Sequence, residues 1–252
     1  MATIRSPRNS RVVAAVRLHR GRARHRTGLS LIEGPNLLME AIAGGARLTV
    51  VFALEDDEPT AQRAHATGLE LVRVTQRVLD RIAATEHPRG PVAILEIPPP
   101  SSPAGIDLLV PWGVSDPGNL GALIRTAAAF GMGIGVGPGS ADPWAPKVLR
   151  AAAGGHFHCP VSPLPDVDRL RSGGYRLVAT VPRGGIPPQE ADFGAQTALL
   201  VGEEAAGLPP DLIARADVRV TIPMRGGMES LNAAVAGAIL AYELSRSRRG
   251  ED

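Results

Sequence analysis

The chain has 252 residues, 44% of them hydrophobic and 21% charged, and its formal net charge is +2. This composition is that of a globular protein and excludes a disordered or fibrous chain. No apolar run approaches the roughly 18 residues needed to cross a bilayer, and the arginine-rich start lacks the apolar core of a signal peptide, so we expect a cytoplasmic protein that does not bind membranes.

The beginning of the chain is basic. Its first 26 residues contain no acid and eight arginines: Arg5, Arg8, Arg11, Arg17, Arg20, Arg22, Arg24 and Arg26. Such a cluster suits the phosphates of a nucleic acid, although a solvated helix face would have a similar composition. Lys147 is the only lysine of the chain, so a general preference for arginine contributes to the pattern.

Residues 1–97 alternate between helical and extended patterns. Apolar spacing predicts helices at 12–19, 35–45, 60–68 and 76–84, and apolar runs predict strands at 48–54, 70–74 and 92–97. This alternation is typical of a small α/β domain. Residues 98–105, PPPSSPAG, are predicted to form a linker, because prolines lack amide donors and favour an extended chain.

The alternation continues more strongly over residues 106–252. The predicted strands are 107–110, 133–137, 157–161, 176–181, 197–202 and 218–222, and the predicted helices are 119–130, 145–153, 166–172, 209–215 and 231–246. Such apolar strands between helices imply a parallel sheet covered on both faces, whose ligands lie beyond the carboxyl ends of the strands. Three loops in that position are rich in Gly, Pro and polar residues: 115-SDPGN-119, 202-GEEAAGLP-209 and 223-PMRGGMESLN-232.

Several common motifs are absent from the sequence. The glycines of 131–139 lack the G-x-G-x-x-G spacing, and neither a P-loop nor a G-x-S-x-G nucleophile elbow occurs. Cys159 is the single cysteine, and 156-HFHC-159 is too isolated for a metal site, so we expect a buried thiol and no metal. As local structure, Asn119 can cap the helix that follows it, and Ser230 can cap the last helix.

Taken together and in this order, the three loops resemble the SpoU branch of the SPOUT RNA methyltransferases. DPGNLGALIRTAAAFG at 116–131 is similar to the first motif, LVGEEAAGLP at 200–209 to the second, and IPMRGGMESLNAAVAGAILAYE at 222–243 to the third. The stretches EGPNLLMEAI at 33–42 and TEHPRGPVA at 85–93 resemble the N-terminal RNA-binding domain that many members carry. The chain departs from the usual motifs at Ala152, Ala205 and Ala234, which leaves a change in substrate fit open.

The resemblance implies a fold, a cofactor and a set of site residues. The expected fold is an N-terminal RNA-binding α/β domain at 1–97, a linker, and a methyltransferase domain at 106–252 with a deep trefoil knot. The expected cofactor is S-adenosylmethionine. Its predicted contacts are Gly202, Ile222, Met224 and Leu231, and the predicted catalytic residues are Asn119, Arg125, Glu204, Ser230 and Asn232.

The expected reaction is methylation of a ribose 2′-hydroxyl, a poor nucleophile that must be aligned and deprotonated. The guanidinium of Arg125 can grip a neighbouring phosphate and stabilise the developing alkoxide. The resemblance also offers Arg125 as the base, which conflicts with a guanidinium that keeps its proton beyond about pH 12. Asn119 can orient the ribose, Glu204 can pair with a cation, and Ser230 and Asn232 supply uncharged donors and acceptors.

The resemblance further implies a homodimer whose last helix, rich in alanine and glycine, supplies much of the contact; core packing within one subunit is the competing explanation. Ribosomal RNA is favoured over transfer RNA as the substrate. A catalytically silent RNA-binding or ribosome-assembly factor of the same fold is a second hypothesis. A small-molecule α/β enzyme is a third, without a nucleophile or metal constellation to support it.

Overall fold

The structure is a computed structural model that describes residues 3–88, 90–101, 105–225 and 230–250. The chain folds into two compact units. Unit 1 comprises Met1–Pro99 and Trp144–Phe157, and unit 2 comprises Pro100–Pro143 and His158–Asp252. Unit 1 therefore includes one segment from the later part of the chain. The linker expected at 98–105 stays a prediction, and its residues 102–104 lie outside the described residues.

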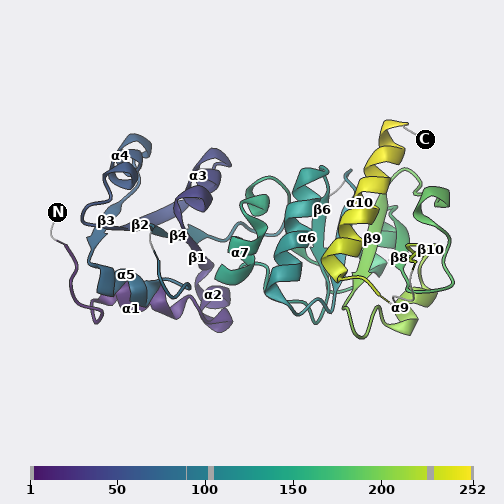
Figure 1. Ribbon diagram of the computed structural model, residues 1–252, viewed down its shortest axis with the longest axis horizontal. Helices are drawn as coiled ribbons and strands as arrows, with labels where there is room; N and C mark the ends of the chain where they lie inside the picture. The colour runs from purple at the N-terminus through teal and green to yellow at the C-terminus, as the bar shows by residue number, and fades with distance from the viewer. Residues whose placement is uncertain (1–2, 89, 102–104, 226–229, 251–252) are drawn as a thin grey trace. The chain divides into compact units, whose positions relative to one another are not determined.

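Unit 1 is built on a mixed four-stranded sheet with the strand order β1-β4-β2-β3 (Figure 1). β1 and β2 are antiparallel to β4, while β2 and β3 are parallel. The strands are β1 (Leu29–Glu33), β2 (Leu48–Leu54), β3 (Leu71–Val74) and β4 (Val92–Glu96). The helices are α1 (Ser10–Arg17), α2 (Gly21–Thr27), α3 (Pro35–Ala43), α4 (Glu58–Thr67), α5 (Gln76–Ile82), α7 (Pro146–Ala152) and the 3-10 turn η1 (Gly155–Phe157).

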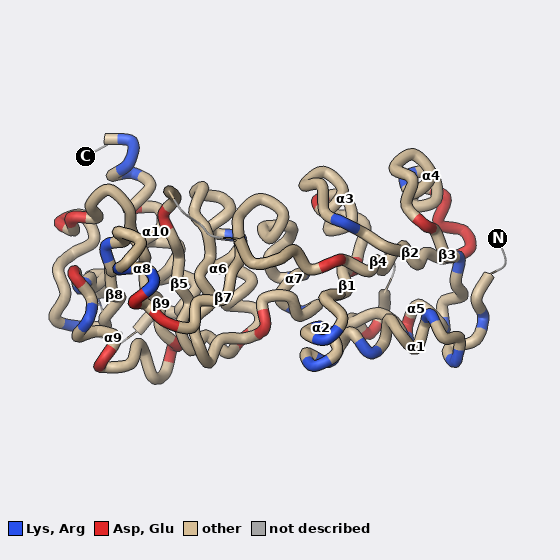
Figure 2. Tube along the Cα trace, turned by 180° about the vertical axis from the view of Figure 1, so that it is seen from behind, with Lys and Arg blue, Asp and Glu red and all other residues tan. Residues whose placement is uncertain are grey.

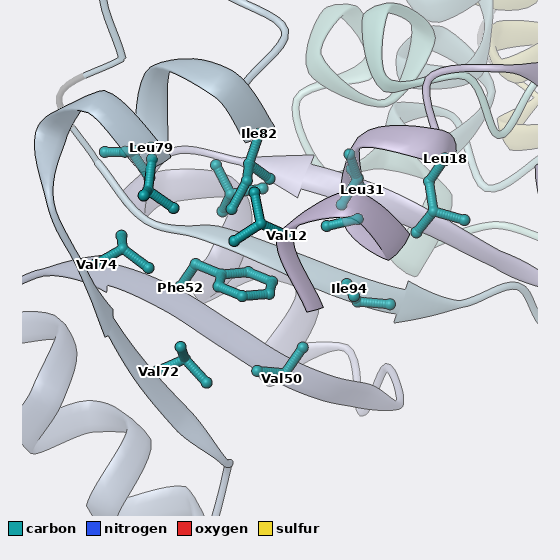
Figure 3. Close-up of a cluster of buried hydrophobic side chains, with 13 residues drawn as sticks. Val12, Leu18, Leu31, Val50, Phe52, Val72, Val74, Leu79, Ile82 and Ile94 are labelled. Carbon is teal, nitrogen blue, oxygen red and sulfur yellow. The ribbon is translucent and has the colours of Figure 1, made fainter. Parts of the chain in front are cut away.

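Alternation along β2 separates two hydrophobic cores in unit 1, because successive side chains of a strand point to opposite faces. Val50 and Phe52 pack against α1 and α5, as Figure 3 shows. Val51 belongs to the second core, with Leu38 of α3 and Leu149 of α7. Helices α1 and α5 thus cover one face of the sheet, and α3 lies on the other with α4 beside it (Figure 1).

Two elements of unit 1 carry no clear sequence pattern. In α2 the only buried residues are Ala23 and Arg24, so no apolar stripe marks the helix. The Arg24 guanidinium instead donates a hydrogen bond of 2.8 Å to the carbonyl of Leu18, which joins α2 to the end of α1. Strand β1 is short, and it places Leu31 in the first core and Ile32 in the second.

Unit 2 contains a six-stranded sheet with the order β10-β8-β9-β5-β6-β7, and all of its paired strands are parallel, as predicted. The strands are β5 (Leu108–Trp112), β6 (Gly133–Val136), β7 (Val161–Pro163), β8 (Arg176–Thr180), β9 (Thr197–Gly202) and β10 (Val218–Val220). The helices are α6 (Pro117–Ala129), α8 (Asp168–Ser172), α9 (Pro210–Ala214) and α10 (Ala233–Arg249), with a 3-10 turn η2 (Pro188–Glu190).

Helices cover both faces of this sheet, which confirms the predicted parallel α/β architecture. Leu170 of α8 and Leu212 of α9 pack on one face. On the other, α10 crosses α6 so closely that a Cβ on Gly237 would lie 2.3 Å from Leu123 Cδ2. The bounds of the strand predicted at 157–161 are wrong: Phe157 ends a 3-10 turn and packs into the second core of unit 1, and the strand, β7, begins only after Pro160.

The chain order of the strands reverses at β5. From β5 the chain proceeds to β6 and β7 on one side, then continues with β8, β9 and β10 on the other. In an open parallel sheet, such a switch point opens a crevice at the carboxyl ends of the strands. The pairing of β5 with β9 ends at Trp112 and Gly202, so the loops that follow these two residues leave the sheet side by side. The trefoil knot stays a prediction.

Candidate active site

The loop after β5 positions Asn119 through the cap of α6. Asp116 is the N-cap, and its carboxylate accepts a hydrogen bond of 2.8 Å from the backbone N–H of Asn119. The expectation that Asn119 caps this helix is therefore wrong, because the acid three residues earlier already occupies the capping position. The Asn119 carboxamide is left available for contacts outside the helix.

At the start of α10 the capping residue is Asn232. Its Oδ1 accepts hydrogen bonds from the backbone N–H groups of Ala234 (2.9 Å) and Val235 (3.2 Å). The alternative that Ser230 caps this helix is wrong, since Ser230 lies two residues before the cap. Capping uses only the oxygen of the Asn232 carboxamide, so its nitrogen can donate elsewhere.

The two carboxamides and Glu204 form one hydrogen-bonded cluster. Asn119 Nδ2 donates to Glu204 Oε1 at 2.8 Å, and Asn232 Nδ2 donates to Asn119 Oδ1 at 2.9 Å and also to Glu204 Oε1. The backbone N–H of Ala233 adds a contact of 3.4 Å to the same Oε1. The cluster thus joins the three loops that the sequence singled out. Within the described part of the chain, every hydrogen bond to Glu204 ends on Oε1 and none on Oε2.

Gly202 explains how the loop after β9 brings Glu204 to this place. The chain turns back at once, and the N–H of Gly207 donates to the carbonyl of Glu203 at 2.8 Å. A Cβ on Gly202 would lie 2.3 Å from the carbonyl carbon of Gly207 and 2.4 Å from the nitrogen of Leu208. Only glycine permits so close a backbone approach at this position.

A cavity of about 600 Å³ lies at the carboxyl ends of β8, β9 and β10. All four predicted cofactor contacts line it: Gly202, Ile222, Met224 and Leu231. Of the predicted catalytic residues, Glu204 and Ser230 line it as well. Asn119 and Asn232 are not among its lining residues and reach its rim through their hydrogen bonds to Glu204.

Sequence reasoning missed one wall of this cavity, which is formed by residues 180–183 at the end of β8 and just after it. The sequence could have indicated this wall, because residues 176–181 are predicted as a parallel strand and ligands bind beyond the carboxyl ends of such strands. Residue 180 pairs with residue 220 of β10, which sets this wall beside the segment that carries Ile222 and Met224.

Arg125 does not join the cluster. It lies six residues after Asn119 on α6, which is about 9 Å along the helix axis and about 120° around it. The side chain is exposed, and it makes no hydrogen bond or ion pair with any residue that the structure describes. Within one subunit, the geometry therefore leaves this guanidinium available to an outside group.

Cys159 is buried, as expected, and burial raises the pKa of its thiol to about 12. A thiol that stays protonated is a poor nucleophile and a poor metal ligand. Over residues 3–88, 90–101, 105–225 and 230–250, no group of three or more His, Cys, Asp or Glu side chains could hold a metal ion. In the same residues, no helix is long and apolar enough to span a bilayer.

Comparison with known proteins decides the family. Residues 108–242 match the SpoU rRNA methylase family, and residues 9–93 match the MRM3-like substrate binding domain. The chain belongs to the SpoU rRNA methylase family. The SpoU region spans β5 to α10, so it contains the whole cluster and the cavity.

Relatives of this SpoU chain match it over nearly its full length. The 23S rRNA (guanosine(2553)-2′-O)-methyltransferase RlmP of Bacillus subtilis is 36% identical, over 97% of this chain and 99% of its own. The SpoU methyltransferase AviRb of Streptomyces viridochromogenes, solved in complex with AdoMet, superposes with a TM-score of 0.87 at 27% identity and covers 97% of this chain and 100% of its own. An AdoMet-bound rRNA methyltransferase from Sinorhizobium meliloti gives a TM-score of 0.85 at 29% identity, with 98% of each chain covered.

Proposed function

We propose that this SpoU-family protein methylates a ribose 2′-hydroxyl of RNA, with S-adenosylmethionine as the methyl donor and ribosomal RNA as the substrate. The observation that carries the proposal is the Asn119–Glu204–Asn232 cluster at the rim of the cavity of about 600 Å³. The resemblance to an rRNA 2′-O-methyltransferase over 97% of the chain supports both the reaction and the class of RNA.

The cavity fits S-adenosylmethionine in size and chemistry. Its volume falls in the range of small-molecule sites. Val201, Leu208 and Ile222 supply apolar surface suited to an adenine ring, and the missing Cβ of Gly202 lets backbone form the wall. The carboxylates of Glu203 and Glu204 suit a ligand that carries positive charge. When bound, this cofactor supplies a methyl group on a positively charged sulfur.

Glu204 is the proton acceptor in this proposal. A ribose hydroxyl that accepts a methyl group would lose its proton, and that proton needs an acceptor at the site. The Asn119 and Asn232 amides hold Oε1 of Glu204, which fixes the plane of the carboxylate and leaves Oε2 to accept the hydroxyl proton. Asn119 and Asn232 are positioning residues in this scheme, and Ser230 on the cavity wall offers the ribose a further hydrogen bond.

Arg125 binds the substrate through charge. A guanidinium that is exposed and unpaired within the described subunit can make two parallel hydrogen bonds to a phosphate of the RNA. Arg125 lies about 120° around α6 from Asn119 and makes no contact with the cluster of its own subunit, so we propose that it serves a site to which a second subunit contributes. This role is electrostatic, and it leaves proton removal to Glu204.

We propose that the second subunit is a copy of this chain, bound through α10. Ala233, Ala234, Gly237 and Ala241 are buried within their own subunit, so these small residues serve the crossing with α6 and the sheet. The outer side of α10 carries a different set: Val235 and Tyr242 are each 48% exposed, and Ile239 lies between them. Positions i, i+4 and i+7 share one face of a helix, which gives α10 an outward apolar stripe suited to a second copy.

The test is transfer of labelled methyl from S-adenosylmethionine to purified rRNA and, separately, to tRNA. We compare the wild type with Glu204→Gln, which keeps Oε1 as an acceptor but replaces Oε2 by an amide. Glu190→Gln is the matched control, because Glu190 is an exposed acid of unit 2 that does not line the cavity.

We expect label in rRNA, a loss of about 100-fold or more in Glu204→Gln and full activity in the control. Label in tRNA alone would reassign the substrate class. No label together with no binding of S-adenosylmethionine in calorimetry would contradict the proposed reaction and favour a silent RNA-binding factor.

A further inference from the structure

Unit 1 separates its charges between the two faces of its sheet. Residues 8–27 and 76–82, which include α1, α2 and α5, contain nine arginines and one acid, Asp80. Residues 35–67, which include α3 and α4 on the other face, contain two arginines and five acids. Figure 2 shows the basic stretches along α1 and α2 and the acidic ones beside α4.

Two of these nine arginines have structural partners. Arg11 forms an ion pair of 2.7 Å with Glu70, and Arg24 is buried and donates to the carbonyl of Leu18. The remaining seven are exposed, and their side chains make no hydrogen bond or ion pair within the described residues: Arg8, Arg17, Arg20, Arg22, Arg26, Arg77 and Arg81. We call these seven residues the arginine face.

Helices α1 and α5 turn their apolar sides inward, which directs their arginines outward. Val78, Leu79 and Ile82 of α5 are fully buried in the first core, and Arg77 and Arg81 share the outer side one turn apart. Arg22 and Arg26 are likewise one turn apart on α2. Like charges at this spacing destabilise a helix by a few tenths of a kcal/mol per pair, so the face carries an uncompensated repulsion that a polyanion would relieve.

We infer that the arginine face is the surface on which unit 1 binds the phosphate backbone of the substrate RNA; this inference rests on the proposed function. Guanidinium groups make paired hydrogen bonds to phosphate oxygens. Residues 8–27 and 76–82 contain no Phe, Tyr or Trp on which a base could stack, so this face reads the shape and charge of folded RNA and leaves base selection to other parts of the chain.

The composition of the face favours RNA over a membrane surface. A helix that lies in a bilayer interface needs a broad apolar side toward the lipid. Among the described residues of α1, α2 and α5, Val13 is the only large apolar side chain that is exposed, at 36%. The acids of the other face gather at residues 55–58, at the start of α4, and they offer no attraction to a polyanion, so we place the bound RNA on the arginine face.

The experiment measures binding of a 23S rRNA transcript by the full-length protein over a series of salt concentrations. The two test variants are Arg77→Gln/Arg81→Gln and Arg22→Gln/Arg26→Gln. The matched control is Arg47→Gln/Arg63→Gln, which removes the same charge from the α3–α4 side. Arg77→Lys/Arg81→Lys tests charge alone, and Asp80→Asn removes the one acid of the face.

Each lost phosphate contact lowers the slope of log affinity against log salt by about 0.7 to 0.9. Each test variant should therefore lose about 1.4 to 1.8 in slope, which is roughly 10- to 30-fold in affinity at 0.15 M salt. The control should stay within about twofold, the lysine variant should keep most of the slope, and Asp80→Asn should bind more tightly.

Binding of S-adenosylmethionine, followed by calorimetry, separates this inference from the proposed function. We expect the test variants to bind the cofactor as the wild type does and to lose RNA affinity. If the wild type methylates rRNA while both test variants keep its salt slope and affinity, the arginine face is overturned and the proposed function stands. If the wild type binds no RNA at any salt concentration, both fail together.

Discussion

Replacing Gly202 by alanine tests whether the cavity depends on the backbone approach seen at the end of β9. The new Cβ would lie 2.3 Å from the carbonyl carbon of Gly207, whereas ordinary contacts begin near 3.4 Å, so the backbone must move by about 1 Å. That shift strains the hydrogen bond of 2.8 Å from Gly207 to Glu203, worth about 1 kcal/mol, and adds about 1 to 3 kcal/mol of overpacking. We expect a loss of about 2 to 4 kcal/mol in the free energy of unfolding of unit 2.

The same shift would displace Glu204, which lies two residues after Gly202. A misplacement of about 1 Å at a reacting group can cost about 100-fold in rate. We therefore expect Gly202→Ala to bind S-adenosylmethionine weakly in calorimetry and to transfer methyl groups at least about 100-fold more slowly than the wild type. Denaturant unfolding, followed with and without the cofactor, reports the stability change.

Gly174→Ala is the matched control, because it adds the same methyl group to unit 2 at a residue that does not line the cavity. Gly174 has a φ of +82°, and a Cβ there would meet nothing within 4 Å. Its cost is conformational, about 1 kcal/mol, and should leave the methylation rate within a few fold of the wild type. The reasoning is refuted if Gly202→Ala binds the cofactor and methylates RNA as well as Gly174→Ala does.

Four further predictions concern single residues. Arg125→Ala should lower the rate of methyl transfer by about 100-fold without changing the free energy of unfolding. Arg125→Lys should recover only part of that rate, because lysine cannot make two parallel hydrogen bonds to a phosphate. Wild-type activity in Arg125→Ala would contradict the proposed phosphate contact. Asn232→Ala should cost about 1 kcal/mol in denaturant unfolding through loss of the cap, whereas Asn232→Asp should keep the cap and lose activity by placing a charge beside Glu204; wild-type activity in Asn232→Asp would argue against the cluster. Tyr242→Glu should convert a dimer to a monomer in light scattering, and a wild type that is monomeric at micromolar concentration would refute the shared site. Burial raises the pKa of Cys159 from 9.0 to about 12, so this thiol stabilises the fold below pH 9 and that contribution is lost as the pH rises toward 12; rapid alkylation of the native protein at pH 8 would disprove the burial.

Most strands and helices could be predicted from the sequence because their apolar residues recur at regular intervals. The elements that escaped depend on contacts between distant residues. Helix α2 has no apolar stripe and is held by the buried guanidinium of Arg24, and β1 divides its side chains between two cores. Phe157 was included in a predicted strand because it is apolar, but it lies in a 3-10 turn and packs against the second core of unit 1.

The candidate site could be predicted at the level of loops and less well at the level of contacts. Parallel-sheet logic and the family resemblance both pointed to the loops that carry Asn119, Glu204 and Asn232. Which residue caps each helix was predicted wrongly: Asp116, and not Asn119, accepts an N–H of the first turn of α6, and Asn232, and not Ser230, accepts those of α10. Arg125 does not reach Glu204 because it lies six residues after Asn119 on α6, and this separation depends on how α6 faces the loop after β9.

Few backbone hydrogen bonds hold strand β10, which forms part of the cavity wall. It pairs with β8 through only three residues, and its outer side is tied by backbone hydrogen bonds at Ile186 and Thr221. A wall with so few hydrogen bonds can open locally without unfolding of the whole unit, and a ligand bound against it would oppose that opening. Amide exchange in β10 and in residues 181–187 should therefore slow when the cavity is filled, so the last strand of the sheet would report occupancy of the site.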